Sequence, residues 1–267
     1  MREPAATPIT RGKTERPLEE HFPLSSTDAR AARAALEALL ADDPPALPDG
    51  FSTSVERYVE LLLDANQRLN LTRIVEPSAV ARLHLLDSLT ALPWIDAWRP
   101  RRAVDLGSGG GVPGIVLAMA RPDVAWTLVD SVGKKAAAMR GFVAELGLPN
   151  VAVVAARAEE IGHQPEHREA YDLVAARALA SLPVLTEYAL PLVEVGGHLL
   201  AWKGRLAGDE LDAGGRASAT LGGEVPTVEP VGHEALADHR FVIVPKVRPT
   251  SPRYPRRPGE PARRPLG

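Results

Sequence analysis

The glycine-rich stretch between Gly107 and Gly114 constrains this 267-residue chain more than any other feature of its sequence. Five of its eight residues are glycine, and it lies between a short apolar run and a helix-forming segment. Glycine at such a junction lets the backbone come close to a ligand and also permits positive φ angles. The stretch therefore predicts a loop that holds a nucleotide-like cofactor.

Short apolar runs alternate with helix-forming segments along the middle of the chain. We expect strands at 102–106, 124–130, 151–156, 171–176 and 196–204, and helices at 112–120, 133–148 and 182–193. A further helix within 208–225 and one or two closing strands that include 240–247 complete the pattern. This alternation predicts an α/β fold with a mostly parallel sheet and helices on both faces.

The segment before this alternation is helical in character. Val55, Leu62 and Leu69 recur at helix spacing, and further helices are expected at 27–40 and 77–92. The chain therefore divides into four parts. These are a disordered extension (1–26), a helical N-terminal cap (27–98), the sheet core (99–248) and a basic, proline-rich C-terminal tail (249–267).

Composition excludes several classes of protein. The chain has no cysteine, which removes disulfides, Cys-ligated zinc, iron–sulfur clusters and any thiolate nucleophile. The amino-terminal stretch is charged and broken by proline, with no apolar segment typical of a signal peptide. No later apolar run is long enough to span a bilayer. We therefore expect a cytoplasmic protein that does not enter a membrane.

Charge is unevenly distributed along the chain. The formal net charge is −3, but residues 246–267 carry seven Lys or Arg against one acid, or about +6. Prolines in the same segment argue against helix or central strand and predict an extended arm, or a segment disordered until it binds. A basic arm of this kind can bind a phosphate backbone, and it can also serve only as a solubilising tail.

Two cofactors compete for the glycine loop. Gly109, Gly111 and Gly114 form a literal dinucleotide fingerprint, and Asp130 follows Gly109 by 21 residues, as the ribose acid does in such sites. However, Asp105 stands at the end of the strand directly before the glycines, and a carboxylate there repels a pyrophosphate.

S-adenosylmethionine (SAM) carries an ammonium and a sulfonium instead. Asp105 can help to hold its amino-acid end, directly or through water, while Gly109 lets the backbone approach and Asp130 accepts ribose hydroxyls. These residues favour SAM over NAD as the ligand of the glycine loop. A turn with only a structural role is the third and least favoured interpretation. Asp130 can also serve as a helix N-cap.

Separated blocks of the sequence resemble the RsmG (GidB) family of bacterial 16S ribosomal RNA methyltransferases, which methylate guanine at N7. They are "NLTRIVEPSAVARLHLLDSL", "VDLGSGGGVPGIVLA", "TLVDSVGKK", "VVAARAEEI", "YDLVAARALASL", "LAWKGR" and "YPRRPGEPARRPLG". The resemblance implies a class I SAM-dependent methyltransferase fold, and SAM contacts at Gly107, Val112, Ala158, Glu159 and Arg177. The chain departs from the family's pattern in its amino-terminal extension and in the segment 212–223.

The residues themselves are compatible with these roles but leave alternatives open. Ala158 and Glu159 follow the third strand of the core, where an adenine lying across the strand ends would reach. Glu159 can equally be an exposed acid at a helix start. Arg177 ends the fourth strand and is the best single candidate for a link between cofactor and RNA. Its alternative is a salt bridge to an acid such as Asp172 or Glu187.

No catalytic acid or base can be assigned. The absence of cysteine excludes the covalent route to carbon 5 of a pyrimidine, and the chain lacks the Asn/Asp-Pro-Pro-aromatic motif of adenine amine methylation. Guanine N7 already carries an in-plane lone pair, so its methylation needs positioning rather than a base. His84 and Asp87 share a helix face, but without a second histidine a hydrogen bond is favoured over a metal site.

RNA contacts are expected from basic residues, although each can instead merely face solvent. The candidates are Arg157, Lys203, Arg256 and Arg257. The expected partner is 16S rRNA or the small ribosomal subunit, bound by a monomer with its target guanine splayed out of the stack. Two alternatives remain: an NAD(P)-dependent oxidoreductase, although no Tyr-x-x-x-Lys pair is found, and a non-catalytic RNA-binding protein.

Overall fold

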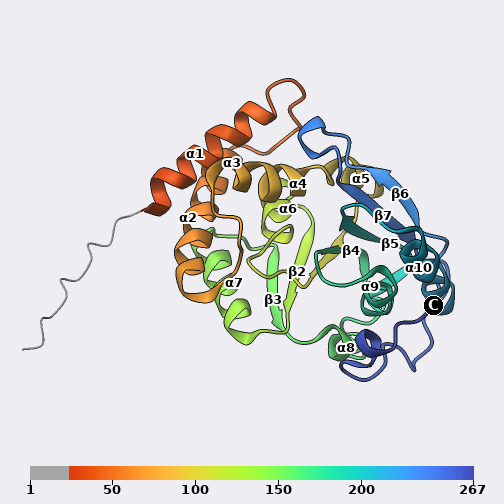
Figure 1. Cartoon of the computed structure of the whole chain (residues 1–267). Coiled ribbons are helices and arrows are strands. Elements are labelled where there is room, and N and C mark those ends of the chain that lie inside the picture. Colours follow the sequence, from red (N-terminus) through yellow and green to blue (C-terminus); the bar gives the residue numbers. More distant parts are fainter. Residues whose placement is uncertain (1–23) are drawn as a thin grey trace, which may run out of the picture.

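The computed structural model describes residues 24–267 (Figure 1). The predicted extension therefore lies outside the described residues as far as position 23. Its last three residues, Leu24, Ser25 and Ser26, belong to a helix, so the predicted boundary at residue 26 is wrong. No helix in the described part of the chain is both long and apolar enough to cross a membrane.

Helices precede the sheet, as the sequence predicts. They are α1 (Leu24–Leu39), α2 (Phe51–Leu69), α3 (Pro77–Val80), the π-helix η1 (Ala81–Leu86), α4 (Asp87–Leu89) and α5 (Leu92–Trp98). The long helix α2 forms because Val55, Tyr58 and Leu62 recur on one face and are all fully buried. The single helix expected at 77–92 is instead α3, η1 and α4 in succession, and the π-helical turn contains His84.

The sheet has seven strands in the order β3-β2-β1-β4-β5-β7-β6. They are β1 (Arg102–Leu106), β2 (Ala125–Asp130), β3 (Val151–Ala155), β4 (Tyr171–Arg177), β5 (Val193–Lys203), β6 (Thr227–Pro230) and β7 (Arg240–Pro245). The pairs among β1 to β5 are parallel, and β7 is antiparallel to both β5 and β6. The prediction of a mostly parallel sheet with closing strands is confirmed.

The remaining helices cover the two faces of this sheet (Figure 1). They are α6 (Gly114–Ala120), α7 (Gly133–Glu145), α8 (Ala158–Ile161), α9 (Leu182–Ala189), α10 (Gly208–Leu221) and the 3₁₀ turn η2 (Glu234–Leu236). One buried apolar cluster joins the N-terminal helices, α6 and α7 to the sheet, and a second joins α9 and α10 to its other face. Strand β2 contributes Leu128 to the first cluster and Val129 to the second, as alternation along a strand requires.

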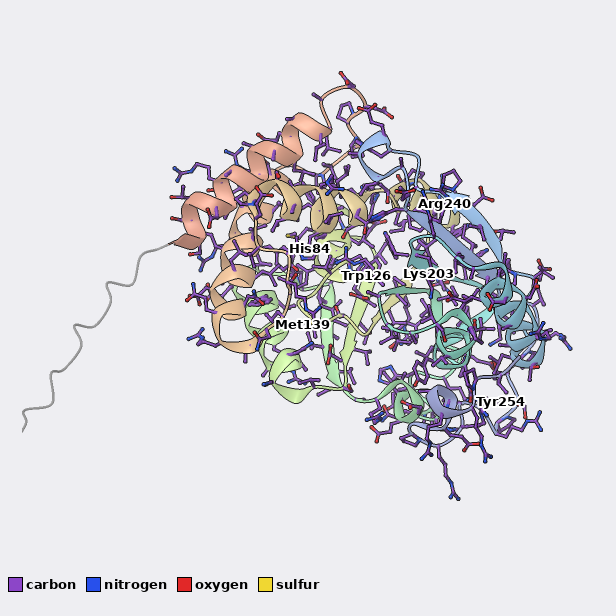
Figure 2. All side chains as sticks on the ribbon, in the orientation of Figure 1. His84, Trp126, Met139, Lys203, Arg240 and Tyr254 are labelled. Carbon is purple, nitrogen blue, oxygen red and sulfur yellow. The ribbon has the colours of Figure 1, made fainter. Side chains whose placement is uncertain are left out.

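The C-terminal tail does not match its prediction. It packs against α8 and α9, buries Tyr254 and contains the short helix α11 (Glu260–Arg263) (Figures 1 and 2). The expectation of an extended or disordered arm is therefore wrong. The prolines are compatible with this path because Pro261 stands in the first turn of α11, where no N–H is needed. The guanidinium of Arg168 donates hydrogen bonds to the carbonyls of Thr250, Ser251 and Tyr254.

Candidate functional site

A cavity of about 410 Å³ opens at the carboxyl ends of the parallel strands. Its lining includes five residues singled out in the sequence as cofactor contacts, which are Gly107, Gly109, Asp130, Ala158 and Glu159. The volume falls within the range of roughly 300–1,000 Å³ that is typical of small-molecule sites. The topology thus brings the ends of β1, β2 and β3 to one site, as ligand binding at the carboxyl edge of a parallel sheet requires.

The glycine loop is held against β2 by its own backbone. The amides of Gly107 and Ser108 both donate to the carbonyl of Val129, at 2.9 and 3.0 Å. Gly107 and Gly109 have φ angles of +78° and +61°, a region that glycine enters without strain. A Cβ on Gly107 would also lie 2.6 Å from a methyl group of Leu179. The turn therefore favours glycine at position 107, and a larger residue would also have to displace the side chain of Leu179.

Asp130 ends β2 and faces the cavity. One of its carboxylate oxygens accepts a hydrogen bond from the amide of Gly109 at 2.9 Å, and the other accepts one from Val132 at 2.8 Å. A carboxylate has about four lone-pair positions, so two further donors can be accommodated. The pair of hydroxyls on a ribose fits this requirement. The N-cap of α7 is Val132, and among residues 24–267 no side chain caps this helix, so the alternative role of Asp130 as the helix N-cap is wrong.

Asp105 lies behind the loop rather than in the cavity. It is fully buried, and its Oδ2 accepts hydrogen bonds from the hydroxyl of Ser108 and the amide of Gly114. Its Oδ1 has no hydrogen-bond partner among the described residues. Burial raises the pKa of this carboxyl to about 6. Asp105 does not line the cavity, so direct contact with the ligand is not supported by this geometry, and contact through water stays a prediction. In the structure Asp105 holds the loop. Val112 is likewise buried and does not line the cavity.

Ala158 and Glu159 form part of the cavity wall. Glu159 is 3% exposed, so the alternative of a solvent-exposed acid is wrong. Its Oε1 accepts a hydrogen bond of 2.8 Å from the amide of Gly259 in the C-terminal tail. The small side chain of Ala158 leaves the adjacent space free for a flat ring. Arg157 precedes this pair at the rim, with half of its side chain exposed.

Arg177 does not reach the cavity. Its guanidinium turns towards the N-terminal helices, where it contacts the carbonyl of Leu83, the carboxylate of Asp87 and the ring of His84. The expected ion pair exists, but its partner is Asp87 rather than Asp172 or Glu187. The expected role in contacting the cofactor is not supported by this geometry, because residues 178 and 179, not Arg177, line the cavity.

Asp87 is the centre of this buried polar network. Its Oδ1 lies 2.8 Å from Nδ1 of His239, and its backbone carbonyl accepts a hydrogen bond from the indole of Trp202. His84 lies among the N-terminal helices facing the sheet (Figure 2). Burial and the nearby charge of Arg177 lower the pKa of His84 to about 4. The two ring nitrogens of His84 contact the hydroxyl of Thr72 and the guanidinium of Arg177, in agreement with the hydrogen-bond interpretation. No group of side chains suited to a metal ion occurs between residues 24 and 267.

Two of the four residues that were expected to contact RNA instead form ion pairs within the protein. Nζ of Lys203 donates to the carbonyl of Ala180 and to Glu210, both within 2.9 Å, and 15% of its side chain is exposed. Arg256 is paired with Glu187, which is fully buried. Arg157 and Arg257 remain exposed.

Comparison with known proteins identifies the family. The family "rRNA small subunit methyltransferase G" (GidB) matches residues 52–239. The chain belongs to this family. A methyltransferase G of Roseiflexus castenholzii is 47% identical over 211 residues, which cover 79% of this chain and 89% of that protein. One from Deinococcus radiodurans is 45% identical over 211 residues, covering 79% and 83%.

Solved structures place this methyltransferase G chain in a wider fold class. A putative O-methyltransferase from Klebsiella pneumoniae superposes with a TM-score of 0.52 at 16% identity, covering 80% of this chain and 97% of that one. A putative S-adenosylmethionine-dependent methyltransferase from Methanococcus maripaludis gives 0.51 at 13% identity, covering 70% and 91%. At these identities the likeness concerns the fold alone, and it confirms the predicted class I methyltransferase fold.

The cavity of this methyltransferase G chain also contains residues that sequence reasoning missed. Lys135, Leu179 and Tyr188 all line it. Lys135 lies in the first turn of α7, about one turn beyond Asp130. Its position shortly after the expected ribose acid was the sequence feature that indicated a place at the cavity. Tyr188 lies on α9 with no motif around it. Burial and the neighbouring charge of Glu159 raise the pKa of its phenol.

Proposed function

We propose that this chain transfers the methyl group of SAM to N7 of a guanine in 16S ribosomal RNA. Membership of the methyltransferase G family is the observation that carries both the substrate class and the choice of SAM as cofactor, and Asp130 gives the cavity a carboxylate for ribose hydroxyls. Asp130 would hold the ribose hydroxyls, while Ala158 and Glu159 would border the adenine.

The chemistry follows from the nucleophile. SAM supplies a methyl group on a sulfonium, and the N7 lone pair forms the new bond as the sulfur–methyl bond breaks. The positive charge moves from sulfur to the base, and no proton is transferred in this step. The protein's contribution is to align the guanine with the methyl donor and to keep water out. The backbone of Gly107 and Gly109 provides the close approach, and no side chain acts as acid or base.

The RNA is held outside the cavity by exposed basic residues. Arg157 and Arg257 are exposed, whereas Lys203 and Arg256 are occupied by internal ion pairs, so the proposal rests on the first two. Removing either charge should weaken RNA binding and reduce its salt dependence by about one counterion. We place the reaction in the cytoplasm, where ribosomal subunits are assembled, with the protein acting as a monomer on 16S rRNA or the small subunit.

The test is methyl transfer from tritiated SAM to small subunits isolated from a strain that lacks this gene. Borohydride–aniline cleavage then maps N7-methylguanine. We expect a single new cleavage with the wild-type protein and none with Gly107→Asp. Gly147→Asp is the matched control, because Gly147 also has a positive φ but lies in an exposed turn with open space around it. Labelling elsewhere in the RNA would overturn the N7 assignment, and SAM binding without RNA labelling would indicate a small-molecule substrate.

A further inference from the structure

The C-terminal strap, which we define as residues 250–263, reaches the wall of the cofactor cavity. Glu159 is buried in that wall, and the amide of Gly259 donates a hydrogen bond of 2.8 Å to its carboxylate. The nearest guanidinium nitrogen, Nε of Arg157, is 3.7 Å away, which is too far for a hydrogen bond. A buried carboxylate that loses its donor is costly to keep in place. The strap therefore controls where this carboxylate points.

Arg256 fixes the strap three residues before Gly259. Its guanidinium and its backbone amide all donate to the carboxylate of Glu187, with distances from 2.5 to 3.1 Å. Glu187 is fully buried on α9 and directly precedes Tyr188, which lines the cavity. An arginine clamp with two donors on a buried carboxylate defines both position and angle. The strap is thus anchored to the helix that supplies another part of the same cavity.

Arg168 and His163 also hold the backbone of the strap. Arg168 donates to the carbonyl of Gly162, directly after α8, and also to the carbonyls of Thr250 and Tyr254 in the strap. The ring of His163 contacts the carbonyl of Pro255 at 2.7 Å. These contacts join the strap to the residues that follow Glu159 in sequence. Gly259 itself has a φ of +80°, the left-handed conformation that glycine adopts readily, and it caps α11.

We propose that the strap is a structural part of the cofactor site, with Gly259 and Arg256 as positioning residues that act through Glu159. The inference rests on the proposed function, because it assigns the strap to the SAM cavity. Arg256 does not touch the ligand in this scheme. It holds the strap on Glu187 so that the amide of Gly259 stays within hydrogen-bond distance of Glu159. In this scheme the buried residues of the basic tail help to form the cofactor site, and its exposed residues bind the RNA.

The test is calorimetric binding of SAM alone, with no RNA present, to the full-length wild type and its variants. We expect Arg256→Ala to raise Kd for SAM about tenfold, the size of effect usual for residues that orient a ligand-contacting group. Arg256→Lys should recover part of the affinity, because one ammonium cannot reproduce the two-donor clamp. Arg263→Ala removes the same charge from an exposed position of the strap and should leave Kd within about twofold of wild type.

Two further measurements separate positioning from general loss of structure. Amides of α8 should exchange with deuterium faster in Arg256→Ala, and KM for SAM should rise with little change in kcat. Glu187→Gln keeps the shape of the clamp and serves as the second variant if Arg256→Ala fails to fold. A wild-type Kd in folded Arg256→Ala or Glu187→Gln would overturn the inference while leaving the proposed function intact. Failure of the wild type to bind SAM would overturn the proposed function, and the inference with it.

Discussion

The guanidinium of Arg177 lies 3.1 Å from the carboxylate of Asp87, across the boundary between the sheet and the N-terminal helices. The two side chains are 16% and 2% exposed. Asp87 also accepts from His239 on the loop before β7, so one carboxylate joins three parts of the chain that are remote in sequence. This network, rather than the cofactor cavity, is where the end of β4 makes its polar contacts.

Asp87→Ala should destabilise the fold strongly. The change leaves the buried guanidinium of Arg177 without its carboxylate, and removing one partner of a buried pair typically costs about 3–5 kcal/mol. Urea unfolding measures the loss. Arg205→Ala is the control, because its pair with Asp238 is exposed and contributes about 1 kcal/mol or less. Equal effects of the two changes would contradict a structural role for the network.

Asp105 should make the folded protein more stable as the pH falls from 7 to 5. Its folded pKa of about 6 lies above the ordinary value of 3.8, so between these values the folded state binds the proton more tightly than the unfolded chain does. From pH 7 to pH 5 the wild type should therefore gain about 1 kcal/mol relative to Asp105→Asn. Chemical unfolding of both proteins at the two pH values measures this difference, and a constant difference would show that Asp105 is not buried as described.

His84 should make the folded protein less stable as the pH falls from 7 to 5. Its pKa is lowered from 6.5 to about 4, so the unfolded chain takes up a proton before the folded protein does as the pH falls through that window. This one group should cost about 2 kcal/mol between pH 7 and pH 5. Titration of the His84 ring by NMR gives the direct measurement. A midpoint near 6.5 would mean that the ring is hydrated and free of Arg177.

Asp130→Asn should weaken SAM binding. The amide keeps one acceptor oxygen but loses the charge and the capacity for two ribose hydroxyls, and hydrogen bonds to charged groups contribute about 1.5–3 kcal/mol. An increase in Kd of about tenfold or more is expected by calorimetry. Asp123→Asn, an exposed acid just before the same strand, is the matched control and should bind SAM as the wild type does. Unchanged binding by Asp130→Asn would remove the ribose assignment.

The parts of the fold that the sequence predicted depend on local signals. Alternating apolar runs identified the core strands, and the spacing from the glycines to Asp130 identified one end of the cavity. The role of Arg177 was not accessible in this way, because its partner Asp87 is 90 residues away and lies on a helix whose π-helical turn has no clear sequence signature. Tyr188 was missed for the same reason, since only the packing of α9 brings it to the cavity.

The tail shows how composition can mislead. Its prolines and positive charges are typical of a solvated arm, and the prolines do prevent a regular strand. The structure satisfies its carbonyls through Arg168 and neutralises Arg256 with Glu187, a carboxylate that was considered from sequence only as a partner for Arg177. Neither pairing can be read from residue types, because each joins segments more than 60 residues apart.

The hydrogen bond from Gly259 to Glu159 also has a consequence for synthesis of the chain. The two residues are 100 positions apart, and a protein is made from its amino terminus. The strands that form the floor of the cavity leave the ribosome well before the residues that fix its wall. A nascent chain can therefore build its sheet early and still lack the contact that orients Glu159, which it acquires only once Gly259 has been added.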